Sequence, residues 1–193
     1  AGVEKALKAA DGEIDALVNN AGIGITGPVE AQDREATKLA FETNVYGCHR
    51  MVLAVLPAMR ARGDGVIFPI SSQLGRLIEP GAGHYSATKF ALESMSEQLA
   101  YELVPLGIDV SIIQPGGYPT KIWVNRNRLT GALKDRTPQH VQDAYPLFVA
   151  RMGEEDGSGR NTDPMDVPRA IAEILAMPKG KRPLRREVHP THR

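Results

Sequence analysis

A tyrosine and a lysine four residues apart are the first pair in this sequence that could do acid–base chemistry. Tyr85 and Lys89 lie in a segment with helical spacing of apolar residues, so both side chains lie on one face of a helix. A free tyrosine hydroxyl has a pKa of about 10 and is a poor base at neutral pH, but a nearby ammonium group stabilises the phenolate. Together the two side chains could give and take a proton near pH 7.

A serine hydroxyl is expected beside this pair. Ser72 precedes Tyr85 by 13 residues and follows an apolar run at residues 65–71 that is typical of a buried parallel strand. A hydroxyl there could hold a carbonyl oxygen by a hydrogen bond that strengthens as negative charge develops on that oxygen. The 13-residue interval selects Ser72 rather than its neighbour Ser71.

Two more strands should bring further residues to the same place. They are expected at residues 16–19 and 108–114, and the polar or turn-forming pairs Asn19-Asn20 and Pro115-Gly116 follow them. The carboxyl ends of parallel strands meet at one edge of a sheet, where α/β folds place their ligands. The sequence therefore predicts one site built from three strand ends and the helix of Tyr85.

These segments resemble the motifs of the short-chain dehydrogenase/reductase family in both order and spacing. The matching pieces are Asn-Asn-Ala-Gly at 19–22, Thr-Asn-Val-Tyr-Gly at 43–47, Ser-Ser at 71–72, Tyr-Ser-Ala-Thr-Lys at 85–89, and Pro-Gly at 115–116 with Thr120. The resemblance implies an oxidoreductase that uses NAD or NADP to interconvert an alcohol and a ketone or aldehyde by hydride transfer.

The resemblance also implies a role for particular residues. The implied catalytic residues are Asn44, Ser72, Tyr85 and Lys89, with Lys89 also gripping the nicotinamide ribose and Asn44 holding a water molecule in a proton relay to Tyr85. The residues implied to line the cofactor are Asn19, Ala21, Gly22, Tyr85, Lys89, Pro115, Gly116 and Thr120.

The alternation of short aliphatic runs with long helical patterns predicts an α/β fold with a doubly wound, Rossmann-like parallel sheet. Residues 1–193 are expected to form a single partial domain in which residues 117–163 are a substrate-loop insertion with two short helices. Other helices are expected at residues 3–10, 33–60, 85–103 and 170–177, with a kink at Pro57 and an edge strand at 184–188.

The expected amino-terminal part of the family's fold has no counterpart in this chain. That part is a strand, a glycine-rich turn and a helix, which together hold the pyrophosphate of the cofactor. The glycines at 22, 24 and 27 have a similar spacing, but they follow the Asn-Asn-Ala-Gly strand and Pro28 comes next, so a loop is expected. The glycine-motif half should therefore be absent from this chain, and strand 16–19 should form an exposed edge.

Two smaller departures concern single residues. Pro69 cannot donate a backbone hydrogen bond, so a bulge or a locally unpaired stretch is expected in the second strand. Tyr118 stands where the family usually has an aliphatic residue. Neither departure falls on the catalytic set.

Composition excludes several other classes of protein. The chain has 193 residues, with 23 basic and 23 acidic side chains, and zero net charge argues against bulk-charge binding to nucleic acid. The basic run at 179–186 lacks interleaved aromatic residues and is expected to be a solvated tail. A single cysteine, Cys48, excludes an internal disulfide and favours a reducing, cytoplasmic location. No apolar run is long enough to cross a membrane, and no histidine has metal-ligand spacing.

Several alternatives stay open. Asn19-Asn20 could be a strand-ending turn, Asn44 a buried polar residue bonded to backbone, and Pro115-Gly116 a loop breaker. The alternative function is a non-catalytic binding or scaffold protein on the same fold, because the phosphate-binding segment is absent. A sugar epimerase or dehydratase is disfavoured by the Asn-Asn-Ala-Gly motif.

Assembly and substrate are the last expectations. Helices 33–60 and 85–103 are more apolar than one face against a sheet requires, and the resemblance implies that such helices pair across a two-fold axis. A homodimer or homotetramer acting on a small alcohol or carbonyl compound is therefore expected. The identity of that substrate is left open by the sequence.

Overall fold

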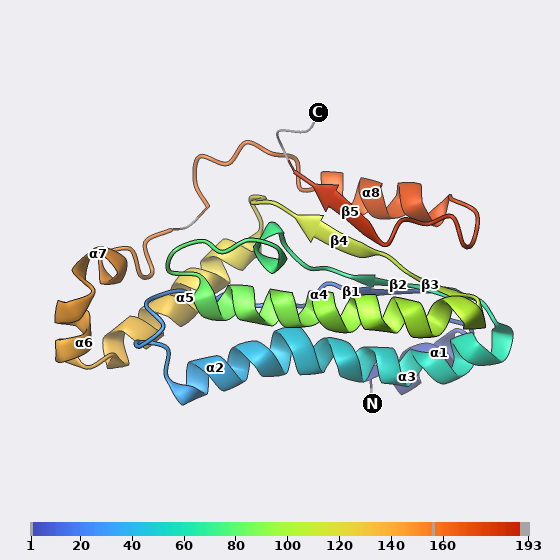
Figure 1. Cartoon of the computed structure of the whole chain (residues 1–193), viewed down its shortest axis with the longest axis horizontal. Helices are drawn as coiled ribbons and strands as arrows, with labels where there is room; N and C mark the ends of the chain where they lie inside the picture. The colour runs from blue at the N-terminus through green and yellow to red at the C-terminus, as the bar shows by residue number, and fades with distance from the viewer. Residues whose placement is uncertain (1, 156, 190–193) are drawn as a thin grey trace.

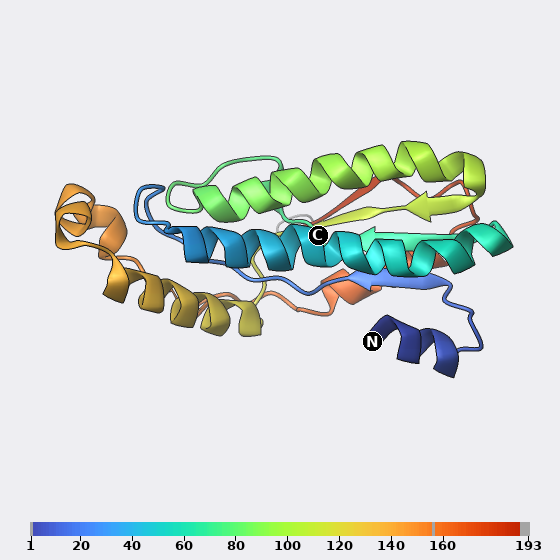
Figure 2. The same ribbon diagram turned by 90° about the horizontal axis from the view of Figure 1, so that it is seen from below.

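The computed structural model of this chain describes residues 2–155 and 157–189. Parallel strands form a sheet with helices on both faces, and the carboxyl ends of the strands all point toward the same end of the molecule (Figures 1 and 2). This is the Rossmann-like fold that the alternating pattern predicts. The strands are β1 (Ala16–Asn19), β2 (Gly65–Pro69), β3 (Ile108–Val110), β4 (Ile112–Pro115) and β5 (Arg185–Val188).

The strands pair in two parallel groups that meet near Pro69. One group has the order β1-β2-β3 and the other is β4-β5, joined by an isolated bridge between Ile70 and Ile113. β3 and β4 belong to the single strand expected at 108–114, which is interrupted at Ser111. Pro69 lies on the side of β2 that faces this break and offers no amide hydrogen, so the expected local loss of pairing is found here. Among the described strands, β1 pairs only with β2 and forms an edge.

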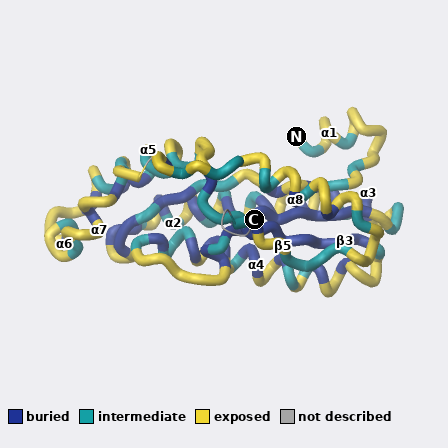
Figure 3. The backbone as a smooth tube through the Cα atoms, turned by 90° about the horizontal axis from the view of Figure 1, so that it is seen from above, coloured by how far each residue is buried: buried dark blue, intermediate teal, exposed yellow. Residues whose placement is uncertain are grey.

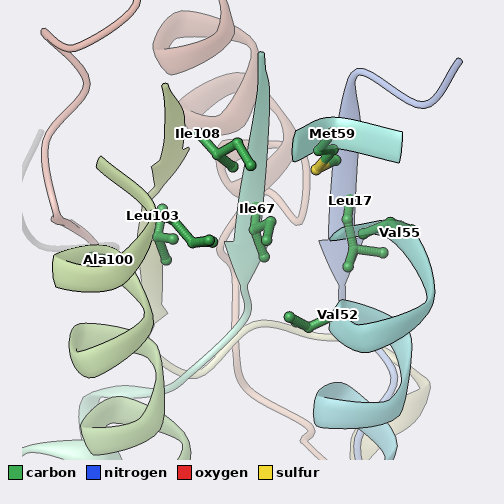
Figure 4. Close-up of a cluster of buried hydrophobic side chains, with 9 residues drawn as sticks. Leu17, Val52, Val55, Met59, Ile67, Ala100, Leu103 and Ile108 are labelled. Carbon is green, nitrogen blue, oxygen red and sulfur yellow. The ribbon is translucent and has the colours of Figure 1, made fainter. Parts of the chain in front are cut away.

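Two helices cover one face of the sheet and form a hydrophobic core with it. They are α3 (Gly47–Arg62) and α4 (Gly83–Leu103), and Ile67 of β2 lies between them (Figure 4). The buried side chains of this cluster are Leu17, Val52, Val55, Met59, Ile67, Ala100, Leu103, Ile108 and Val110. The central strand is buried along its whole length, which explains its apolar sequence.

The opposite face is covered by α8 (Asp166–Leu175), which begins four residues before the helix expected at 170–177 and ends two residues before its expected end. Ala170 and Ile174 of this helix pack against Phe68 of β2 and Val188 of β5. The buried Tyr118 joins the same cluster, so its ring fills core space on this face. The remaining amino-terminal helix, α1 (Gly2–Ala9), contains no buried residue.

The helix expected at residues 33–60 is divided into three helical segments. α2 (Arg34–Phe41) begins at Asp33, whose carboxylate accepts a hydrogen bond from the Ala36 amide at 2.7 Å. A π-helical turn at Glu42–Tyr46 follows, and α3 then continues past Pro57 to Arg62. π-Helical turns are rare and occur mostly near functional sites, and no pattern in the sequence indicated this one.

The insertion at residues 117–163 contains more helix than expected. Instead of two short helices it has three, and α5 (Lys121–Arg136) is 16 residues long, followed by α6 (Gln139–Ala144) and α7 (Pro146–Val149). The periodicity of α5 is weak because only Thr130 and Leu133 of this helix are buried. The three helices extend beyond the carboxyl ends of the strands and are mostly exposed, whereas β2 and β3 are buried (Figure 3).

Two contacts attach the outer part of the insertion to the rest of the fold. Arg136 forms an ion pair with Asp33 at the start of α2, and the Tyr145 hydroxyl donates a hydrogen bond to Glu30 at 2.9 Å. The hydrogen bond to Arg136 is the main reason that the pKa of Asp33 lies below its usual value. The insertion is thus held to the segment at residues 30–33 by Arg136 and Tyr145, in addition to its covalent connections at residues 117 and 163.

Candidate active site

The candidate site lies where the strands end and α4 begins. Asn19 is the last residue of β1, Ser72 follows β2, and Pro115 ends β4. Tyr85 and Lys89 lie in the first two turns of α4. The predicted convergence of strand ends with this helix is therefore what the fold produces (Figure 1).

Lys89 points inward from α4 toward the end of β2. Its side chain is buried, and Nζ donates a hydrogen bond to the carbonyl oxygen of Ile70 at 2.8 Å. The same Nζ lies 5.8 Å from the centre of the Tyr85 ring. Tyr85 itself is partly exposed, whereas the ammonium group of Lys89 is buried.

Asn44 is held in the π-helical turn by bonds on both sides of its amide group. Oδ1 accepts a hydrogen bond from the Ile23 amide at 2.8 Å, and Nδ2 donates to the Ile23 carbonyl at 2.8 Å. Nδ2 also donates to Thr88 Oγ1 at 3.0 Å. The structure thus shows the backbone-bonded role that remained an alternative for Asn44. Oδ1 keeps a second lone pair, which is the acceptor left for a further partner.

The two neighbouring serines have different surroundings. Ser72 Oγ accepts a hydrogen bond from the Leu74 amide at 3.1 Å and caps the short 3₁₀ turn Gln73–Gly75. Ser71 Oγ lies beneath that turn, where a Cβ added to Gly75 would come within 2.7 Å of it. It has no hydrogen-bond partner among the described residues. Only Ser72 therefore belongs to the turn that leads toward Tyr85.

The expected cofactor-lining residues occupy the loops around this site. Gly22 faces Asn44 and Lys89, since a Cβ built on it would lie 3.4 Å from Asn44 Oδ1 and 3.7 Å from Lys89 Nζ. Asn19 is buried and donates a hydrogen bond to the Cys48 carbonyl at 3.2 Å, so it links β1 to α3. The remaining four residues are Ala21, which is exposed, Pro115 and Gly116, which are partly exposed, and Thr120, which caps α5.

Burial and the lysine charge shape the titration of nearby groups. Burial raises the pKa of the Cys48 thiol, and the positive charge of Lys89 opposes this shift. Burial also lowers the pKa of His84, the neighbour of Tyr85, so its neutral form is favoured. The positive charge beside Tyr85 is therefore that of Lys89 rather than of His84.

A cluster of aromatic and charged side chains joins the two ends of the insertion. The Trp123 ring has the guanidinium of Arg126 on one side, 4.3 Å from its centre, and that of Arg160 at 4.0 Å. Glu155 forms ion pairs with both arginines. Arg126 packs on Gly24, while Gly22 to Gly27 form an irregular loop that α2 follows only at Arg34. The three glycines thus form a loop and not a phosphate-binding turn, as expected.

A family model described as short chain dehydrogenase matches residues 1–130 of this chain. The chain belongs to the short-chain dehydrogenase family. Among curated relatives, it is 38% identical over 181 residues to 3-ketodihydrosphingosine reductase of Bacteroides thetaiotaomicron, an alignment that covers 93% of this chain and 64% of the relative. It is 34% identical to human retinol dehydrogenase 8, with 97% and 60% covered. The chain thus spans less than two thirds of the length of these dehydrogenases.

Solved structures of short-chain dehydrogenases have the same fold. A family member from Burkholderia phymatum in complex with NAD superposes with a TM-score of 0.76 at 28% identity, covering 97% of this chain and 65% of that one. A serine dehydrogenase complexed with NADP+ gives 0.75 at 26% identity, with 96% and 69% covered. Proteins with this fold therefore include one that binds NAD and one that binds NADP+.

Sequence reasoning overlooked three parts of this short-chain dehydrogenase site. They are the π-helical turn that carries Asn44, the Ile70 carbonyl that holds Lys89, and the Thr88 hydroxyl between Asn44 and Tyr85. Only Thr88 left a usable signal, because a residue three positions after Tyr85 shares its helix face.

Within residues 2–155 and 157–189, no helix has the length and apolar character needed to cross a membrane. The same ranges contain no group of three or more His, Cys, Asp or Glu side chains placed to hold a metal ion.

Proposed function

We propose that this protein is an NAD- or NADP-dependent oxidoreductase that interconverts an alcohol and a ketone or aldehyde. The observation that carries the proposal is the buried Lys89 ammonium, held by the Ile70 carbonyl and lying 5.8 Å from the centre of the partly exposed Tyr85 ring. Burying a lysine ammonium group costs free energy because the charge loses its hydration. A buried positive charge beside a tyrosine can stabilise the phenolate form of that tyrosine.

The residues around Lys89 fit the nicotinamide end of such a cofactor. Gly22 leaves open the space beside Asn44 Oδ1 and Lys89 Nζ, which any side chain would begin to fill. The bound nicotinamide would supply or accept the hydride. Lys89 would hold the adjoining ribose and Asn44 a water molecule of the proton relay, as the family resemblance implies. Asn19, Ala21, Gly22, Pro115, Gly116 and Thr120 would line the cofactor.

Ser72 and Tyr85 would act on the substrate oxygen. In the reducing direction, the Ser72 hydroxyl donates a hydrogen bond to the carbonyl oxygen, whose negative charge grows as the carbon is reduced. Tyr85 donates its proton to that oxygen, and the Lys89 ammonium stabilises the phenolate that remains. In the oxidising direction the phenolate removes the proton from the alcohol. The insertion at residues 117–163, anchored at its outer part by Arg136 and Tyr145, would cover the substrate.

A non-catalytic scaffold remains the second candidate. It is favoured by one observation, the lack of a glycine-rich strand-turn-helix among the described residues. The two candidates are separated by assaying the complete protein, meaning residues 1–193 with any segment that its gene encodes before or after them. An oxidoreductase changes the near-ultraviolet absorbance of the reduced nicotinamide when mixed with alcohols or carbonyl compounds, and a scaffold does not.

The two serines give a sharper test of this mechanism. Ser72→Ala is expected to lower kcat of the complete protein by about 10²- to 10³-fold, because one donor to the developing oxyanion is lost. Ser71→Ala is the matched control and should cost much less, since its hydroxyl lies beneath Gly75. Steady-state kinetics on both variants measure the difference, and the opposite order would refute the assignment of Ser72.

We further propose that α3 and α4 pair with a second copy of the chain across a two-fold axis, giving a homodimer or homotetramer. Large apolar side chains stay exposed on these helices and the preceding π-helical turn, namely Tyr46, Met51, Leu53, Phe90 and Met95. Apolar side chains gathered on neighbouring helices could be buried against a second copy. Light scattering on the complete protein at micromolar concentration should show at least a dimer, and a monomer alone would exclude this pairing.

A further inference from the structure

Thr88 joins two of the proposed catalytic segments through one buried hydroxyl group. Its Oγ1 donates a hydrogen bond to the backbone carbonyl of Tyr85 at 2.7 Å and accepts one from Asn44 Nδ2 at 3.0 Å. Thr88 has no exposed surface and Asn44 is 1% exposed, so neither bond competes with solvent. The π-helical turn and the first turn of α4 are therefore linked by two buried hydrogen bonds of the Thr88 hydroxyl.

The two bonds also fix which way the Asn44 amide faces. A hydroxyl has a single hydrogen, and that of Thr88 is used by the Tyr85 carbonyl. Thr88 can then only accept from Asn44, which must present its NH₂ group to Thr88. Oδ1 is consequently turned to the Ile23 amide and toward the space beside Gly22. The Thr88 hydroxyl and the backbone of Ile23 thus together set the direction of the free lone pair on Asn44.

Other threonines of this chain also donate a hydrogen bond to a backbone carbonyl of the preceding helical turn, but Thr88 makes a second bond. Thr37 donates to the Asp33 carbonyl at 2.9 Å and Thr137 to the Leu133 carbonyl at 2.8 Å, both within their own helical segments. Thr88 adds to such a bond a side-chain partner 44 residues away in the chain. Its second bond is the one that reaches the site.

We propose that Thr88 is a positioning residue of the oxidoreductase site, holding the Tyr85 turn against the Asn44 amide so that both face the substrate side in a fixed orientation. The inference rests on the proposed function and extends it to a residue that contacts neither substrate nor cofactor. Lys89 is held separately by the Ile70 carbonyl. Loosening the Tyr85 turn would therefore change the position of the phenol relative to an ammonium group that stays in place.

The test compares variants of the complete protein. Thr88→Val keeps the shape of the side chain and removes the hydroxyl, Thr88→Ser keeps the hydroxyl, and Thr37→Val makes the same change at a helix bond outside the site. Thr88→Val should lower kcat by about 10- to 100-fold with little change in KM, because the Tyr85 carbonyl and the Asn44 amide each lose one hydrogen bond and the link between their two segments is broken. Its pH–rate profile should move to higher pH, since the phenolate is stabilised less. The kcat of Thr88→Ser should lie within about threefold of that of the unaltered protein. Thr37→Val should have the same kcat and pH–rate profile as the unaltered protein.

Several results would overturn the inference. They are an unchanged kcat and pH–rate profile in Thr88→Val, or equal damage in Thr88→Ser. If Thr88→Val does not fold, the smaller Thr88→Ala is judged by the same criteria. Failure of both to fold while Thr37→Val folds would assign Thr88 to fold stability instead. Tyr85→Phe separates the two levels: if it stays active, the proposed function fails, and if it is inactive while Thr88→Val is normal, only the role of Thr88 fails.

Discussion

Tyr85→Phe is expected to lower turnover of the complete protein by about 10²- to 10⁴-fold, the range for losing a positioned proton donor. The substitution removes one oxygen atom and leaves the ring, so packing at the start of α4 is preserved. The ammonium of Lys89 then has no phenolate to stabilise. Steady-state rates with a nicotinamide cofactor and an accepted alcohol or carbonyl compound measure the effect.

A second tyrosine of the same helix provides the control. Tyr101 lies four turns further along α4, exposed, with its hydroxyl donating to Glu97 at 2.6 Å. Tyr101→Phe makes the same chemical change away from the strand ends and should leave kcat unaltered. Retention of more than a tenth of the activity by Tyr85→Phe would remove this residue from the proton transfer. Equal losses in both variants would show that the loss reflects the stability of α4.

A polypeptide limited to residues 1–193 is expected to be inactive and to bind NAD or NADP no more tightly than about millimolar, a free energy of about 4 kcal/mol. Backbone amides at a helix amino terminus normally hold the pyrophosphate, after a glycine-rich turn. Among the described residues, no strand is joined to a helix by such a turn. In the proposed function, the loops of Gly22 and Pro115 and the helix of Lys89 contact only the nicotinamide end.

Calorimetric titration of this polypeptide with each cofactor measures the affinity. The matched control is a chain in which the amino-terminal segment of a full-length short-chain dehydrogenase precedes residue 1, and it should bind more tightly. β1 pairs only with β2 among the described strands, so the bare polypeptide should also associate through this edge. A micromolar dissociation constant for residues 1–193 alone would show that the described residues suffice for cofactor binding.

The strands and their order along the chain could be predicted from the sequence because the apolar runs are continuous. All residues of β2 are buried, as are Leu17 and Asn19 of β1, and such strands have few polar positions to obscure the pattern. The place where the candidate site residues meet was predictable for a related reason. Tyr85 and Lys89 share a helix face whatever the tertiary structure, and parallel strands always end at the same edge.

The insertion and the helix of Asn44 show where local patterns stop being informative. α5 has two buried residues in 16, so its length follows from packing on distant segments such as the loop of Thr26, whose amide donates to Thr130 at 3.1 Å. The residues of the π-helical turn at Glu42–Tyr46 likewise form no pattern that distinguishes this turn from an α-helix. Its position is associated with the bonds of Asn44 to Ile23 and Thr88, which lie far away in the chain.

The sequence by itself determined the fold class, the family resemblance and the identities of the candidate site residues, because these depend on periodicity and on short spacings within one element. Only the tertiary structure decided what holds each side chain in place. The Lys89 ammonium is directed by the Ile70 carbonyl, Asn44 by Ile23, and the Asn44 amide by the Thr88 hydroxyl. These partners come from separate segments whose bonds form when the chain is folded, so hydrogen-bond geometry between them leaves no periodic trace in the sequence.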